Sequence, residues 1–291
     1  MKFRLPAEIR HDLNGFRCLV DLNSNADDFF FEEIELEMGS VGWLDADMCA
    51  ALGAVLYKLG ANLNEIKLTN IKPSVEGILC RNGFLSHYGR EKMPDRYGTT
   101  IPYQRFEVKD DRYFATYIEN QFIGRSEMPA MSTALEKKFR ESVFEIFSNA
   151  VIHSQTKMGI FSCGQFFPKK QQLVFTVADL GIGIRRNVEE SRGLAMAPDE
   201  AISWATEGTN TTKNGSIPGG LGLKLLREFI KLNEGVLRIV SDAGHWMLSN
   251  GAVQTALFDN PFPGTVVNIE INTSDKHSYI LKSEVSESDI F

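Results

Sequence analysis

The sequence has few cysteines, no long apolar run and no excess of basic residues. Its four cysteines, Cys18, Cys49, Cys80 and Cys163, contain no Cys-x-x-Cys pair, so neither a zinc site nor a disulfide framework is indicated. No apolar run reaches the length of a membrane span, and no signal-peptide core follows the first residues. The formal net charge of −7 is unlike that of a general nucleic-acid binder. We therefore expect a reduced, cytoplasmic protein without nucleic-acid or membrane partners.

The first half of the chain alternates predicted strands with predicted helices. A helix is predicted over residues 45–59, because Asp45 can cap its start and apolar residues recur at helical spacing. A short helix follows Ser74 and stops near Gly83. This order indicates a sheet with helices packed on it. Three segments have the composition of strands: residues 17–22, 29–36 and 65–71.

This pattern resembles a STAS-like domain, as found in anti-sigma-factor antagonists and related regulatory proteins. The resemblance covers roughly residues 15 to 90 and rests on the order of strands and helices. Thr69 and Ser74 lie nearest to the expected position of a phosphoacceptor, and both also suit structural roles in a strand and a helix cap. We expect residues 1–95 to form a STAS-like α/β regulatory domain that binds a protein partner. Residues 96–130 are then a connector.

The second half, residues 131–275, is predicted to be the larger domain. A long helix is expected over 132–152 and another over 222–232. Because strands outnumber helices and the later strands are antiparallel neighbours, we expect an α/β (α+β) sandwich with a mixed, largely antiparallel sheet and helices on one face. Residues 276–291 are expected to be a tail. The long helix should bury Leu135, Phe139, Val143, Ile146, Phe147 and Ala150. The predicted strands are 158–166, 173–178, 236–240, 253–258 and 265–271.

The long helix carries a polar stripe of Glu141, Glu145, Asn149 and His153, each four residues from the next. A solvated helix face explains Glu141 well. Asn149 is unfavourable inside a helix, and an amide oxygen that binds Mg²⁺ would explain its presence. Glu145, one turn earlier, could take a proton from an attacking water or hydroxyl. His153 could contact phosphate or stabilise the helix dipole.

Asp179 ends a predicted buried strand and begins the sequence Asp-Leu-Gly-Ile-Gly. A carboxylate in this position can accept a hydrogen bond from the exocyclic amine of a base. Gly181 and Gly183 allow the backbone to turn and to approach a flat ring. Taken alone, the segment is also compatible with an ordinary turn after a strand. Thr265, which follows Gly264, opens a late strand and could support Asp179 through its hydroxyl.

Residues 185–218 are predicted to form a lid, because this long segment is rich in glycine and hydroxyl side chains and contains Lys213. A short helix could lie within it at 199–206. Free N–H groups at the start of the next helix would favour phosphate. The pattern differs from a Walker A loop, since no Gly-Lys-Ser/Thr follows it. The residues that begin this helix are Gly219, Gly220, Leu221 and Gly222.

Together these segments resemble the ATP-binding domain of the GHKL superfamily, which includes gyrase, MutL, heat-shock chaperone and histidine-kinase ATPases. Residues 145–149 match the N box, residues 179–183 the first glycine box and residues 220–223 the second. By this resemblance Asn149 holds Mg²⁺, Asp179 binds adenine, and Glu145 activates the nucleophile. By the same resemblance, the pocket is shaped by Gly181, Gly183, Gly220 and Gly222. The other residues predicted to bind ATP are His153, Lys213, Gly219, Leu221 and Thr265.

The use of the bound ATP stays open between three alternatives. A two-component histidine kinase needs a helical hairpin with a phosphoacceptor histidine before the ATP domain, and the residues after His11 resemble strands instead. We prefer an ATPase or ATP-driven regulatory switch in signalling, in which ATP orders the lid and the STAS-like half transmits that state. The alternatives are a serine/threonine kinase of the anti-sigma-factor type acting on a STAS-like partner, and a non-catalytic ATP-dependent assembly module. A homodimer is a possible assembly.

Overall fold

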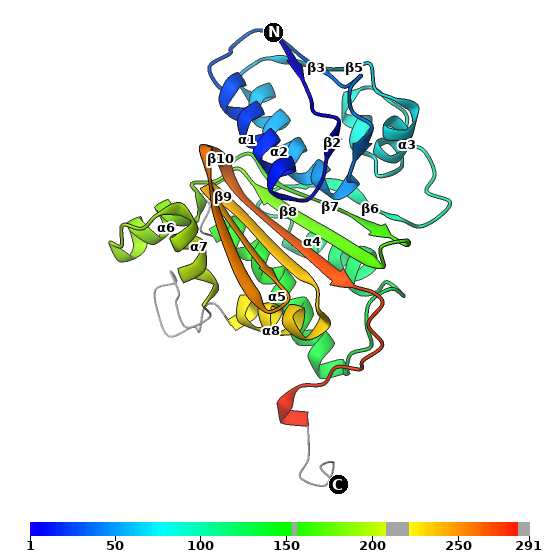
Figure 1. Ribbon diagram of the computed structural model, residues 1–291, viewed down its shortest axis with the longest axis vertical. Helices are drawn as coiled ribbons and strands as arrows, with labels where there is room; N and C mark the ends of the chain where they lie inside the picture. Colours follow the sequence, from blue (N-terminus) through cyan, green and yellow to red (C-terminus); the bar gives the residue numbers. More distant parts are fainter. Residues whose placement is uncertain (153–155, 208–220, 285–291) are drawn as a thin grey trace.

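The computed structural model describes residues 1–152, 156–207 and 221–284. In Figure 1 the N-terminal half of the chain, coloured blue to cyan, lies above a five-stranded sheet, and helices of the second half lie below that sheet. The predicted α/β fold with an antiparallel sheet is confirmed. Among the described residues, no helix is both long enough and apolar enough to cross a membrane.

The N-terminal half is built on parallel strand pairs. Its larger sheet has the order β1-β3-β5, and a second pair joins β2 to β4. The strands are β1 (Lys2–Arg4), β2 (Glu8–Ile9), β3 (Glu33–Glu37), β4 (Trp43–Leu44) and β5 (Glu65–Thr69). The helices are α1 (Leu13–Ala26), α2 (Cys49–Ala61) and α3 (Pro73–Arg81), with a 3₁₀ turn at Ala46–Met48 before α2.

The predicted strand at residues 17–22 is wrong, because these residues lie inside α1. Asp12 caps this helix by accepting a hydrogen bond from the amide of Gly15 at 2.9 Å. The periodicity of a short apolar run does not distinguish a buried strand from a buried helix. Here the N-cap at Asp12 indicates the helix. The strand expected over 29–36 begins later, as β3. The helix predicted over 45–59 and the strand predicted over 65–71 are confirmed by α2 and β5.

A second sheet is antiparallel and has the strand order β6-β7-β8-β10-β9, in which β6 comes from the expected connector and the other strands come from the second half. Every neighbouring pair in it is antiparallel, so this sheet is antiparallel where a mixed sheet was expected, whereas the strand pairs of the N-terminal half are parallel. The two late strands predicted at 253–258 and 265–271 are parts of one long strand, whose register shifts on either side of Phe262. The strands are β6 (Thr100–Phe106), β7 (Ile160–Phe167), β8 (Gln172–Asp179), β9 (Val236–Ser249) and β10 (Ala252–Asn272).

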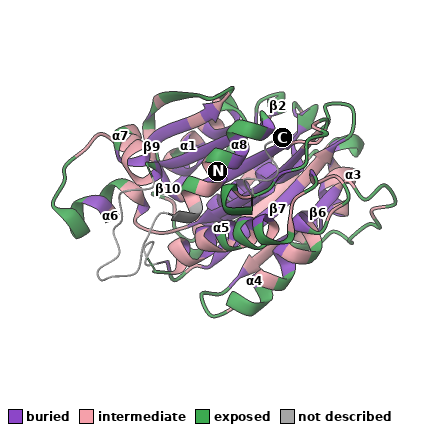
Figure 2. Ribbon diagram, turned by 90° about the horizontal axis from the view of Figure 1, so that it is seen from below, coloured by how far each residue is buried: buried purple, intermediate pink, exposed green. Residues whose placement is uncertain are grey.

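Helices of the second half, together with α4 of the expected connector, cover one face of this sheet. They pack there through aromatic rings: Phe114 stacks on Phe147 with ring centres 4.4 Å apart, and Phe122 stacks on Phe175 at 4.5 Å. The predicted long helix and its buried face are confirmed. Figure 2 shows the strands largely buried, whereas α4 and α6 have exposed turns. The helices are α4 (Asp111–Ile118), which continues as a π-helical turn over Glu119–Ile123, α5 (Thr133–Ile152), α6 (Gly183–Arg192), α7 (Pro198–Thr206) and α8 (Leu221–Asn233).

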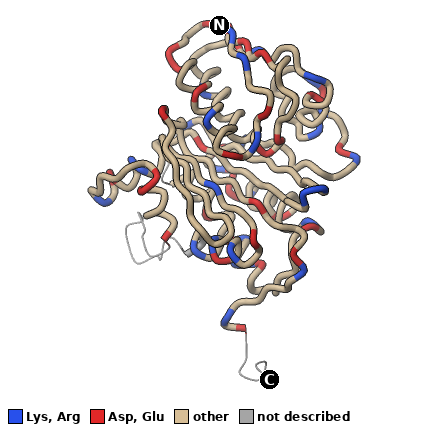
Figure 3. The backbone as a smooth tube through the Cα atoms, in the orientation of Figure 1, with Lys and Arg blue, Asp and Glu red and all other residues tan. Residues whose placement is uncertain are grey.

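The N-terminal half covers the opposite face of the same sheet, which was not predicted. Helix α1 packs on β10, and α2 packs on β7 and β8. Phe161, Cys163 and Val266 from the sheet join a single buried cluster with Phe16 and Leu52 from these helices. Acidic and basic residues are spread over both halves (Figure 3). The sheet is therefore buried on both faces, and it joins the two halves.

Candidate functional site

The carboxyl group of Asp179 lies at the end of β8 and is almost fully buried, with 6% of the residue exposed. Its Oδ1 accepts a hydrogen bond from the amide of Gly181 at 2.8 Å. Thr265 pairs with Asp179 across the neighbouring strand β10, and its backbone N–H also stabilises the carboxylate. Burial outweighs these two N–H groups and raises the pKa of Asp179 to about 7.

Glycine is required at two positions around the turn that follows β8: at Gly264 in the neighbouring strand β10 and at Gly183 at the start of α6. Gly264 has a φ of +155°, and a Cβ on it would lie 2.1 Å from the carbonyl oxygen of Asp179. Gly183 begins α6 with a φ of +77°. The next amide, that of Ile184, donates to Ser241 Oγ at 2.8 Å, and this hydroxyl lies 2.9 Å from the hydroxyl of Thr265. Close backbone contact and a side-chain hydroxyl thus fix the turn that follows Asp179.

The residues of the predicted N box lie on a neighbouring element. Glu145 and Asn149 are half-buried on α5, and α5 packs against both β8 and α8. Leu221 and Gly222 lie in the first turn of α8. The fold therefore brings into adjacent elements the three segments that the sequence analysis selected.

Part of the predicted site lies beyond the described residues. The lid expected over 185–218 is helical over much of its described length, since α6 and α7 occupy it. Helix α7 confirms the short helix predicted at 199–206, whereas α6 was not predicted. The rest of the lid, from residue 208 onward, is outside the described residues. So are four predicted site residues: His153, Lys213, Gly219 and Gly220.

A cavity of about 360 Å³ adjoins the turn after Asp179. One wall is the segment that contains Gly181 and continues to Arg185, and another is Lys58 of α2. Lys58 forms an ion pair with Asp27 at 2.6 Å, and Arg185 forms one with Asp242. Because its walls come from both halves of the chain, the cavity connects the N-terminal half to the candidate site.

Sequence reasoning missed a buried group made by His11, Asp45 and Asp47. Asp45 was expected to cap a helix, but its side chain makes no cap hydrogen bond and faces His11 instead. The sequence Leu-Asp-Ala-Asp-Met at residues 44–48 contained the signal, because two carboxylates among apolar residues require a buried partner. His11 could not be selected as that partner, since it is 36 residues away from Asp47.

Comparison of the chain with protein-family models and with curated proteins found no match. The resemblance to GHKL and STAS-like domains therefore remains a prediction.

Proposed function

We propose that this protein binds Mg-ATP and acts as an ATPase or an ATP-driven regulatory switch. The observation that carries the proposal is the buried carboxyl of Asp179, which backbone N–H groups hold at the end of β8. Adenine offers an amine donor where guanine offers a carbonyl acceptor. A carboxylate that has lost its water gains most from a ligand that donates a hydrogen bond to it. The site thus suits adenine.

The polar stripe on α5 supplies the groups that the phosphate end of ATP needs. Asn149 would hold Mg²⁺ through its amide oxygen, since this ion prefers oxygen ligands that it shares with phosphates. Bound Mg²⁺ would supply charge neutralisation for the triphosphate. Glu145, on the same stripe, would accept the proton of an attacking water. The N-terminus of α8 would offer backbone N–H groups to phosphate.

The packing of the two halves supports a switch. Lys58 of α2 and the turn after Asp179 line the same cavity, so a change in that turn on nucleotide binding would reach the N-terminal half. We infer that this half, which resembles a STAS-like domain, transmits the nucleotide state to a protein partner.

The first test compares ATP with GTP by calorimetry. We expect the intact protein to prefer ATP. Asp179→Asn should weaken ATP binding about 10- to 100-fold, because a hydrogen bond to a charged group contributes about 1.5–3 kcal/mol. The preference for ATP over GTP should also weaken below about pH 7, where the Asp179 carboxylate becomes protonated and loses hydrogen-bond acceptor capacity. Asp111→Asn, an exposed residue on α4, is the control. Unchanged ATP affinity in Asp179→Asn would remove the basis of the proposal.

The second test addresses the reaction. Glu145→Ala should abolish most phosphate release while ATP binding survives, and Glu141→Ala, on the exposed part of the same stripe, should release phosphate normally. Equal release from both variants would exclude Glu145 as the base. Transfer of radiolabel from γ-labelled ATP to a protein would favour the kinase alternative. A change of oligomeric state on ATP binding without turnover would favour the assembly module.

A further inference from the structure

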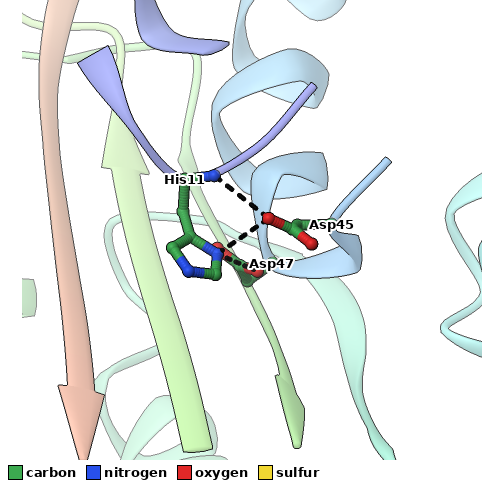
Figure 4. Close-up of side chains that lie close together, drawn as sticks. All are labelled: His11, Asp45 and Asp47. Carbon is green, nitrogen blue, oxygen red and sulfur yellow. Dashed lines mark hydrogen bonds and ion pairs between the residues drawn. The ribbon is translucent and has the colours of Figure 1, made fainter. Parts of the chain in front are cut away.

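A buried group of one histidine and two aspartates lies where the N-terminal half meets the sheet (Figure 4). His11 follows β2, and Asp45 and Asp47 follow β4. The exposed fraction is 7% for His11 and 0% for both aspartates. His11 Nδ1 lies 3.1 Å from Asp45 Oδ2 and 3.2 Å from Asp47 Oδ1, and the three atoms all lie within 4.8 Å of one another.

We propose that His11, Asp45 and Asp47 bind one divalent transition-metal ion of the Zn²⁺ type. One imidazole nitrogen and two carboxylate oxygens form a donor set that such ions take. A tetrahedrally coordinated ion that lies about 2.0–2.2 Å from each donor keeps neighbouring donor atoms roughly 3.3–3.6 Å apart. Both nitrogen–oxygen separations are slightly shorter than that spacing, and the donor atoms of all three residues lie within 4.8 Å of one another, so one ion could reach all three after a local rearrangement of the side chains.

The surrounding residues orient the two carboxylates for this role. Trp43 Nε1 donates to Asp45 Oδ1 at 2.6 Å, and Asn268 Nδ2 donates to Asp47 Oδ2 at 3.1 Å. These bonds occupy the far oxygen of each aspartate and leave the near oxygen toward His11. The near oxygen of Asp45 also accepts from the His11 amide at 3.2 Å. Outer hydrogen bonds of this kind fix the ligands in metal sites.

The position of Glu270 is a second, independent indication of a metal site. It is 5% exposed, and its Oε2 lies 3.8 Å from His11 Nε2, the ring nitrogen that faces away from the aspartates. Arg238 Nη2 lies 2.9 Å from this oxygen as an ion pair, yet among the described residues Oε2 has no hydrogen-bond partner of good geometry. A histidine that binds metal through one nitrogen commonly presents its other N–H to a carboxylate.

Asp45 and Asp47 carry two negative charges, which a divalent ion would neutralise. His11 would bind the ion through the lone pair of Nδ1, so any proton on that nitrogen leaves to solvent. All three ligands belong to the N-terminal half, whereas Asn268 and Glu270 belong to β10 of the sheet. The ion would therefore join the segments after β2 and β4 of the N-terminal half, at the place where that half contacts β10.

Equilibrium dialysis of the intact protein against Co²⁺, without nucleotide, tests the proposal. We expect one Co²⁺ per chain and its visible absorption bands. Asp47→Asn should lower the affinity at least about 10-fold, since even residues outside the ligand set contribute that much. His277→Gln should bind like the intact protein, because His277 is exposed and distant in sequence. Equal Co²⁺ binding by the intact protein and Asp47→Asn would overturn the proposal, as would no binding to either.

A second measurement needs no substitution and so does not depend on whether the variant folds. Crystals of the intact protein equilibrated with Zn²⁺ should show an anomalous peak at the zinc edge between His11 Nδ1, Asp45 Oδ2 and Asp47 Oδ1. A map without a peak at this position would overturn the assignment.

Discussion

The two faces of the five-stranded sheet are covered in different ways. Along β10, Val267, Ile269 and Ile271 point to the face under α5 and α8, whereas Asn268 and Glu270 point to the N-terminal half. The first face is packed through hydrocarbon and aromatic rings. The second adds buried charges and amides to its apolar contacts.

This difference affects how strictly the position of the chain on each face of the sheet is fixed. Apolar side chains can repack against each other at modest cost, but a buried ion left without its partner is strongly unfavourable. The N-terminal half has to place His11 near Asp47, and Asp47 near Asn268. We interpret the polar group as the feature that sets the orientation of the N-terminal half on the sheet, and the following measurements test this.

The largest effect is expected at the polar face. In the metal-free protein, His11→Gln should lower the free energy of unfolding by about 3–5 kcal/mol at pH 7, because it leaves two buried carboxylates without their cation. Denaturant titration measures this. The double variant His11→Gln/Asp47→Asn should lose less than the sum of the single losses, since the second change removes one unpaired charge. Additive losses would contradict the pairing.

In the metal-free protein, prepared with a chelator, the same contribution should depend on pH. Burial lowers the pKa of His11, but the charges and hydrogen bonds of Asp47 and Asp45 outweigh it and raise that pKa from 6.5 to about 10. Because the folded state holds the proton more tightly, the stabilisation is fully present below about pH 6.5 and is lost as pH rises to about 10. The difference in stability between the intact protein and His11→Gln should shrink over this window. A constant difference would show that His11 is not protonated.

An intermediate effect on stability is expected at Gly264, the residue of β10 that contacts the turn after Asp179. Gly264→Ala should cost about 1–3 kcal/mol, because the backbone conformation is unsuited to other residues and the new methyl group would meet the Asp179 backbone. ATP affinity should fall with it. Gly60→Ala, in α2 with nothing near the added carbon, should instead stabilise by about 0.5–1 kcal/mol. Thermal unfolding of both variants gives the comparison, and an equal response would contradict it.

The smallest effect is expected at the apolar face. Ile271→Val should cost about 0.5–1.5 kcal/mol through the loss of one buried methyl group. Since no proton is involved, the loss should be the same at pH 7 and pH 10, unlike that of His11→Gln. Denaturant titrations at both pH values measure this loss of stability. If the loss in Ile271→Val depended on pH, the proposed difference between the two faces would be contradicted.

Much of the fold was predictable because local patterns specify it. The apolar stripe of α5, with Phe139, Val143 and Phe147, predicted both the helix and its buried face. The candidate ATP site was likewise selected from short segments, and the fold places Asp179 and Thr265 on paired strands. The cap at Asp12 was overlooked, and α1 was therefore mistaken for a strand.

By itself, the sequence determined the helices and strands whose periodicity is long enough to be unambiguous. The ATP-binding role of the residues selected from the sequence stays a prediction. Only the tertiary structure decided that the N-terminal half covers the second face of the sheet. It also brought His11 to Asp45 and Asp47, 34 and 36 residues further along the chain. The physical reason is that periodicity reports which side of an element is buried, whereas the partner of a buried charge is set by long-range packing that no local pattern records.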